Sequence, residues 1–271
     1  MTVWQIALCV AAAVALALTL AKLAYAVAGM GLRFWRWRDR PGEADRGLLV
    51  FVHGVKFFGK LWDYAPSAVG FRRAGFDGRI VLWDWHSRPD GLAMLPPIVA
   101  RRRIEAAAAR LAEFLADRRR ERPGSPLYVV GCSAGGYVAV RALELLPPGV
   151  TADGAALLSP AVDPWRDLSA AASHVARPIV VTSSPLDVVL LGAGTLLFGT
   201  GDRRHTPSMG MLGARNRASN PAPAQVRWRP ALMRLGWMGG HSSAVMPDFL
   251  ARRVAPLLGI RPAQQAPCVS R

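Results

Sequence analysis

The feature that most constrains the fold of this chain is a short apolar run that ends in a Gly-x-Ser-x-Gly motif. Residues 126–130 read Pro-Leu-Tyr-Val-Val, and the motif spans Gly131 to Gly135 with Ser133 at its centre. Residues 137–143 can continue as a helix. A strand that turns sharply into a helix around a serine exposes the hydroxyl, and its strained backbone requires small neighbours. The motif therefore predicts a strand–turn–helix unit that presents Ser133 as a candidate nucleophile.

Other continuous apolar runs are typical of strands that are buried on both faces of a sheet. Their spacing predicts strands at 48–52, 79–83, 155–160 and 178–182. Apolar residues at helical spacing predict helices over 98–120 and 249–258. Strands that alternate with helices indicate an α/β fold with a mainly parallel sheet, covered by helices on both faces.

A serine hydroxyl is a weak nucleophile at neutral pH, so it needs an adjacent base that a third group orients. Asp187 follows a predicted strand in the stretch Ser-Ser-Pro-Leu-Asp-Val-Val, where the acid is expected. His241 lies in a Gly-Gly-His-Ser-Ser loop before the last predicted helix and is the candidate base. Asp163, after the strand end at Ser159, is the alternative acid.

From about Leu48 to Leu258 the chain resembles an α/β-hydrolase of the esterase/lipase type. The resemblance is carried by four motifs in family order: His53-Gly54 after an early strand, the Ser133 turn, the Asp187 loop and Gly240-His241 before the last helix. It implies a serine hydrolase that works through a covalent acyl-enzyme. Ser133 would attack a carbonyl, His241 would take its proton, and Asp187 would hold the imidazole tautomer.

The same resemblance implies that two backbone N–H groups stabilise the oxyanion. In this family they come from the residue after the nucleophile and from the loop after His-Gly, which correspond to Ala134 and Val55. The surrounding candidates for the substrate pocket are His53, Gly54, Phe57 and His86.

The intervals between these motifs indicate how open the pocket is. Residues 161–177 leave room for one small helix, so we expect little or no cap over the site. The largest irregular insert, residues 192–230, carries apolar side chains and predicts either a flap over the pocket or an ordinary packed loop.

The N-terminus is strongly apolar. Between Ile6 and Ala21 the only polar side chain is Thr19, and this length approaches the roughly 20 residues that span a bilayer. Residues 33–40 mix arginine with tryptophan, which suits lipid headgroups. We expect a retained single-pass anchor with the hydrolase domain on the cytoplasmic side. The alternative is a cleaved signal peptide and an exported domain.

These boundaries divide the chain into a membrane segment (1–32), a basic juxtamembrane linker (33–47), a hydrolase domain (48–260) and a disordered tail (261–271). The net charge of +16 suits solvated arginines or anionic lipid heads, and no nucleic-acid-binding motif accompanies it. Three scattered cysteines predict neither a disulfide framework nor a metal site, and no phosphate-cradling glycine loop appears, so no cofactor is expected.

The predicted activity is the cleavage of carboxylic esters, small or lipid-like. Two alternatives use the same scaffold. The first is an acyltransferase or thioesterase with the same triad, and the second is a catalytically silent, membrane-tethered binding module.

Overall fold

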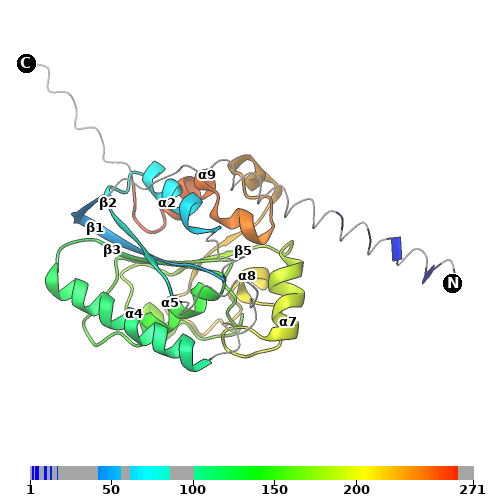
Figure 1. The fold of residues 1–271 in the computed structure, drawn as a ribbon, viewed down its shortest axis with the longest axis horizontal. Helices are drawn as coiled ribbons and strands as arrows, with labels where there is room; N and C mark the ends of the chain where they lie inside the picture. Colours follow the sequence, from blue (N-terminus) through cyan, green and yellow to red (C-terminus); the bar gives the residue numbers. More distant parts are fainter. Residues whose placement is uncertain are drawn as a thin grey trace, which may run out of the picture. The chain divides into compact units, whose positions relative to one another are not determined.

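The computed structural model describes residues 42–55, 62–85 and 101–261, together with isolated positions among the first 17 residues. Residues 39–271 form one compact unit, and residues 1–38 form another. The larger unit is built on a six-stranded, fully parallel sheet in the order β2-β1-β3-β4-β5-β6 (Figure 1). The strands are β1 (Glu43–Val52), β2 (Gly78–Trp83), β3 (Leu127–Cys132), β4 (Gly154–Leu158), β5 (Val180–Ser183) and β6 (Ala224–Arg227).

Helices cover both faces of this sheet. Figure 1 shows α4 (Arg101–Glu121) and α5 (Ala134–Glu144) on one face, and α2 (Tyr64–Arg73) and α9 (Pro247–Phe249) on the other. The remaining helical segments are α6 (Ser169–Ala172), η1 (Val188–Gly194), α7 (Thr195–Phe198), α8 (Met209–Leu212), η2 (Pro230–Leu235), η3 (His241–Val245) and η4 (Leu250–Val254). The expected α/β-hydrolase fold with helices on both faces is confirmed.

The central strands explain why the core lies where it does. Every residue of β3 and β4 is buried, because these strands have neighbours on both sides and helices above and below. Val52 of β1 pairs with Gly131, and Cys132 pairs with Leu158. The chain therefore leaves β1, β3 and β4 at one common edge of the sheet, where ligand sites form in parallel α/β folds.

Several predicted boundaries change. Strand β1 begins at Glu43, five residues before the apolar run, with an irregularity between Glu43 and Leu48. The insert at 192–230 contains α7, α8 and the edge strand β6. The predicted helix at 249–258 is divided into α9 and the π-helical η4. The interval 161–177 holds only the four-residue α6, as expected for a fold with little cap.

The predicted membrane segment lies outside the described residues except for isolated positions, as do residues 33–41 of the predicted linker and most of the C-terminal tail. Residues 43–47 of the predicted linker belong to strand β1. Among the helices in the described part of the chain, none is both long enough and apolar enough to cross a bilayer.

Candidate active site

Ser133 lies in a strained turn between β3 and α5. Its backbone has φ 53° and ψ −122°, a conformation that non-glycine residues seldom adopt. Hydrogen bonds fix it from both sides: Ser133 N donates to Leu158 O at 2.9 Å, and Ala161 N donates to Ser133 O at 2.9 Å. Neighbouring backbone thus holds the strain, as at many reactive serines.

The small residues around this turn are required by contact distances. A Cβ added at Gly135 would lie 2.3 Å from the carbonyl oxygens of Val52 and His53. A Cβ at Gly131 would lie 2.6 Å from Gly135 O. The turn can therefore approach the end of β1 only because its glycines lack side chains.

His241 and Asp187 form a buried pair. The His241 Nδ1 atom lies 2.7 Å from Asp187 Oδ2, and both side chains are at most 7% exposed. His241 begins η3, whereas Asp187 precedes η1 just beyond β5. Donation from Nδ1–H to the carboxylate leaves Nε2 with its lone pair, which is the tautomer that a general base needs.

Ser133 and His241 line the same cavity, which has a volume of about 130 Å³. Among the described residues no hydrogen bond joins the Ser133 hydroxyl to His241. Such nucleophile–base contacts are often long until a substrate aligns the two groups.

The loop after β1 supplies one wall of the cavity. Gly54 N donates to Asp63 Oδ2 at 2.7 Å, so this amide is occupied, whereas Val55 lines the cavity. Ala134 also lines the cavity, and as the first residue of α5 its N–H has no acceptor within the helix. Val55 and Ala134 therefore border the cavity next to Ser133, as an oxyanion hole formed by their amides requires.

His53 is fully buried beneath this loop. Its Nε2 lies 3.0 Å from Asp84 Oδ1, and its Nδ1 contacts Gly54 O. Trp85 donates its indole N–H to His53 O at 2.7 Å and stacks near the imidazole. Neither His53 nor Gly54 is among the described residues that line the cavity. Both instead hold the loop after β1 in place through the contacts described above. The candidates Phe57 and His86 lie outside the described residues.

Asp63 is a residue that the sequence motifs missed. The residue is 1% exposed. Its carboxyl group accepts the Gly54 N–H and interacts with the thiol of Cys132, which is next to the nucleophile. Burial raises the pKa of Asp63, and the Gly54 hydrogen bond and nearby His53 only partly oppose this rise. Burial and the Asp63 carboxyl together raise the pKa of Cys132 well above its ordinary value, so this thiol stays protonated.

Trp62 contacts both the loop after β1 and His241. Its indole N–H donates to Val55 O at 3.3 Å, and its ring centroid lies 5.5 Å from that of His241. The side chain also lines the cavity. Trp62 therefore contacts both the candidate oxyanion loop and the candidate base.

The cavity wall is mainly apolar. Besides Ser133, His241 and Thr195, its lining includes Val55, Trp62, Ile104, Leu190, Leu191 and Phe198. The last three belong to the helical segment directly after Asp187. The helical segment that follows the candidate acid thus supplies much of the pocket.

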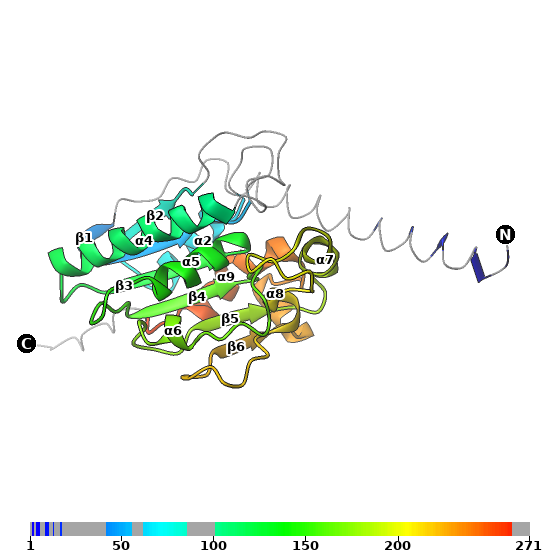
Figure 2. The same ribbon diagram turned by 90° about the horizontal axis from the view of Figure 1, so that it is seen from below.

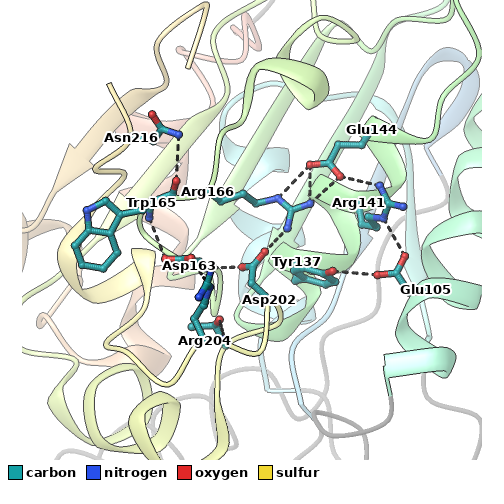
Figure 3. A network of polar contacts seen from close by, with 11 residues as sticks. Glu105, Tyr137, Arg141, Glu144, Asp163, Trp165, Arg166, Asp202, Arg204 and Asn216 are labelled. Carbon is teal, nitrogen blue, oxygen red and sulfur yellow. Dashed lines mark hydrogen bonds and ion pairs between the residues drawn. The ribbon is translucent and has the colours of Figure 1, made fainter. Parts of the chain in front are cut away.

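The alternative acid, Asp163, takes part in a different set of contacts (Figure 3). Its Oδ1 accepts the Trp165 N–H at 3.1 Å, and its Oδ2 lies 3.8 Å from Arg204 Nε. Its own N–H donates to Asp202. The structure therefore brings Asp187, and not Asp163, to His241. In the described part of the chain no group of three or more potential metal ligands gathers.

The parallel sheet, the strained serine turn and the buried His–Asp pair define a serine hydrolase of the α/β-hydrolase fold. The chain belongs to the family Hydrolase_4, described as serine aminopeptidase, S33, whose profile matches residues 43–189.

Several solved structures resemble the chain, among them the following two. Carboxylesterase CesB (YbfK) from Bacillus subtilis is 14% identical, with 86% of this chain and 96% of that chain covered and a TM-score of 0.40. A structure from a study of two prolyl endopeptidases is also 14% identical, with 83% of this chain and 36% of that chain covered and a TM-score of 0.39. No curated protein matches the sequence.

Proposed function

We propose that the protein hydrolyses carboxylic esters with an apolar acyl group, through a Ser133–His241–Asp187 triad. The observation that carries this proposal is the 2.7 Å contact between His241 Nδ1 and Asp187, with Ser133 and His241 on one apolar cavity. A base with a fixed tautomer on the same cavity as a candidate serine nucleophile is suited to acyl transfer.

In the first half of the proposed reaction, the Ser133 oxygen bonds to the ester carbonyl carbon while His241 Nε2 takes the hydroxyl proton. The carbonyl oxygen becomes an oxyanion, which accepts hydrogen bonds from the N–H groups of Val55 and Ala134. The C–O bond to the alcohol then breaks, and the imidazolium returns the proton to the leaving alkoxide. An acyl-Ser133 ester and a free alcohol result.

In the second half, water replaces the alcohol. His241 removes a proton from water as the water oxygen bonds to the acyl carbon, and the proton then passes to the Ser133 oxygen as its bond to the acyl carbon breaks. Asp187 stays ionised and stabilises the imidazolium in both halves. The products are the carboxylic acid and the regenerated serine.

The apolar wall of the cavity favours a substrate with an apolar acyl group. Burial of each CH₂ group against such a wall contributes about 0.8 kcal/mol. The family description names an aminopeptidase. An ammonium group placed against Leu190, Leu191 and Phe198 would lose its hydration without compensation, so this lining favours esters over peptides with a free N-terminus.

A fluorophosphonate probe tests the nucleophile. We expect labelling of Ser133 in the wild-type chain and none in Ser133→Ala of unchanged thermal stability. An absence of labelling in the folded wild type would favour the silent binding module.

A panel of p-nitrophenyl esters of increasing acyl length, beside aminoacyl p-nitroanilides, tests the substrate class. We expect kcat/KM to rise with acyl length and to be low for the anilides. Preference for the anilides would contradict the proposal. Transfer of the acyl group to an added alcohol or release from a thioester, faster than ester hydrolysis, would identify the acyltransferase or thioesterase.

We further propose that residues 1–32 anchor the enzyme in a membrane, with the hydrolase domain cytoplasmic. The support is the apolar stretch at 6–21 and the positive charge that follows it only on its C-terminal side. Protease protection on oriented vesicles tests this, because a cytoplasmic domain is digested in inside-out vesicles and protected in right-side-out ones. The opposite pattern would indicate export.

A further inference from the structure

A continuous helical segment, η1 followed by α7, lies directly after Asp187 and exposes apolar side chains to solvent. Leu197 is 70% exposed, and five other apolar residues nearby are at least 42% exposed. Together the six are Leu186, Val188, Val189, Leu196, Leu197 and Phe198, which we call the η1–α7 patch. Single exposed apolar residues are normal, but a group on one short segment indicates an interaction surface.

The patch carries no charge of its own. Between Pro185 and Gly201 the only charged residue is Asp187, which is 4% exposed and is bonded to His241. A surface that contains only apolar side chains over this length is costly in water and is stabilised when an apolar medium covers it.

The same segment faces the cavity with its other side. Leu190, Leu191 and Thr195 line the cavity, and Phe198 both lines the cavity and is exposed. Figure 2 shows α7 at the edge of the domain, beyond the carboxyl ends of β4 and β5. The patch and the mainly apolar wall of the cavity that contains Ser133 are therefore formed by one segment, and Phe198 belongs to both.

Positive charge adjoins the patch. Arg203 and Arg204 follow α7 after four residues, and the Arg204 side chain is 75% exposed. The chain as a whole carries a net charge of +16. Apolar side chains beside exposed cations match the two layers of an anionic lipid surface, namely acyl chains beneath negative headgroups.

We propose that the η1–α7 patch docks on an anionic lipid bilayer, so that the mouth of the cavity opens toward the membrane. A second copy of this chain could also cover an apolar patch, but it would bring Arg203 and Arg204 of both copies to one interface. Docking does not depend on catalysis. Only its consequence, the direct entry of lipid-like esters, rests on the proposed function.

The first test measures docking without activity. A nitrobenzoxadiazole label is attached to the full chain at Leu197→Cys or, as the matched control, at Leu257→Cys. Both chains also carry Cys9→Ala and Cys268→Ala. Cys132 is kept because it is buried. Leu257 is 42% exposed, and its neighbour Leu258 contacts Gly154 at the opposite, amino end of β4. The chains are reconstituted in phosphatidylcholine vesicles with phosphatidylglycerol and a nitroxide-labelled lipid.

We expect lipid-borne nitroxide to quench the label at 197 several-fold more than the label at 257, also in the Ser133→Ala background. Omission of phosphatidylglycerol should reduce the quenching at 197. Equal, weak quenching at both positions would overturn the proposal. Shielding of position 197 that depends on protein density and not on lipid would show that a second copy covers the patch, and would overturn it too.

The second test measures the consequence for substrate. For Leu197→Asp we expect about tenfold slower hydrolysis of a long-chain ester embedded in anionic vesicles, because an apolar contact is lost and a negative charge is added. Hydrolysis of soluble p-nitrophenyl acetate should be unchanged, and Leu257→Asp should alter neither rate. Equal effects of Leu197→Asp on both substrates would overturn the proposal. If position 197 docks but no ester is cleaved, only the proposed function fails.

Discussion

The backbone N–H of Gly54 donates a 2.7 Å hydrogen bond to the carboxylate of Asp63, and both groups are buried next to the nucleophile. A Cβ at Gly54 would lie 2.9 Å from the Ser133 Cβ, so the loop runs directly against the nucleophile. Because Val55 follows Gly54, the orientation of its amide depends on this bond. Asp63 is thus a positioning residue for the candidate oxyanion hole.

Removal of the Asp63 carboxyl should slow ester hydrolysis mainly through kcat. We expect Asp63→Ala to lower kcat by about 10- to 100-fold, since a displaced oxyanion donor costs this much or more, while KM for the same ester changes little. Asp63→Asn should retain more activity, because its amide oxygen can still accept the Gly54 N–H. Asp248→Asn, which removes an exposed ion pair with Arg73, is the control. A loss in KM alone would contradict this role.

Asp63 also makes stability depend on pH. Its pKa is raised by burial above the ordinary value of 3.8, so the folded state holds this proton more tightly than the unfolded chain does. The free energy of unfolding contributed by Asp63 is therefore largest below the ordinary pKa and decreases as pH rises through the raised pKa. Urea unfolding of wild type and Asp63→Asn from about pH 4 to about pH 8 should show a flatter profile for the variant. Parallel profiles would exclude this contribution.

The sequence predicts the central part of this fold because buried parallel strands are uniformly apolar. The runs at β3 and β4 have no polar face, so their pattern is unmistakable. Strand β6 was missed because it is an edge strand that carries Gln225 and Arg227 and is half-exposed. Its residues pair with β5 for reasons of tertiary packing that a short polar stretch does not reveal.

The residues of the candidate site are likewise predictable only in part from the sequence. Ser133, Asp187 and His241 occur in recognisable local motifs, and the structure brings the acid and the histidine together. Asp63 has no such motif, because its role depends on a contact with Gly54, nine residues earlier, that only the three-dimensional structure shows. The choice between Asp187 and Asp163 likewise depends on three-dimensional distance and not on spacing along the chain.

The choice of acid has a direct kinetic test. We expect Asp187→Asn to lower kcat by roughly 10³- to 10⁴-fold, since an amide at this position stabilises the wrong imidazole tautomer. Asp163→Asn should lower kcat far less, because its contacts are with Trp165 and Arg204. Steady-state kinetics on one soluble ester, with thermal melts of each variant, would separate the two. The reverse order would identify Asp163 as the acid.

The serine turn should not tolerate a methyl group at Gly135. Gly135→Ala places a Cβ 2.3 Å from two backbone oxygens, which cannot move without distortion of β1. We expect a loss of about 1–3 kcal/mol or more in the free energy of unfolding, together with reduced activity. Gly124→Ala is the matched control, because a Cβ there meets no atom within 4 Å. Its stability should change by less than about 0.5 kcal/mol. Similar urea midpoints for both variants would contradict the close approach.

The ion pairs in Figure 3 connect the end of α5 to the loop that borders the cavity. Arg166 contacts Glu144 at 2.7 Å and also pairs with Asp202, and all three side chains are at most 18% exposed. Burial opposes the charge on Arg166, but Asp202 and Glu144 more than compensate and raise the pKa of its guanidinium. Gly201, next to Asp202, packs on the ring of Tyr137 and lines the cavity.

Replacement of Arg166 should therefore affect both stability and the pocket. Arg166→Met removes the guanidinium that pairs with both Glu144 and Asp202. Glu144 keeps its contact with Arg141, and Asp202 keeps the N–H of Asp163. Removal of one partner from such a buried network costs up to about 3–5 kcal/mol. The exposed pair of Arg120 with Asp117 provides the control, since Arg120→Met should cost less than about 1 kcal/mol. Because Asp202 would no longer hold the loop at Gly201, we also expect KM for long-chain esters to rise more than KM for short ones. Equal urea midpoints for the two variants would show that the network does not stabilise the loop.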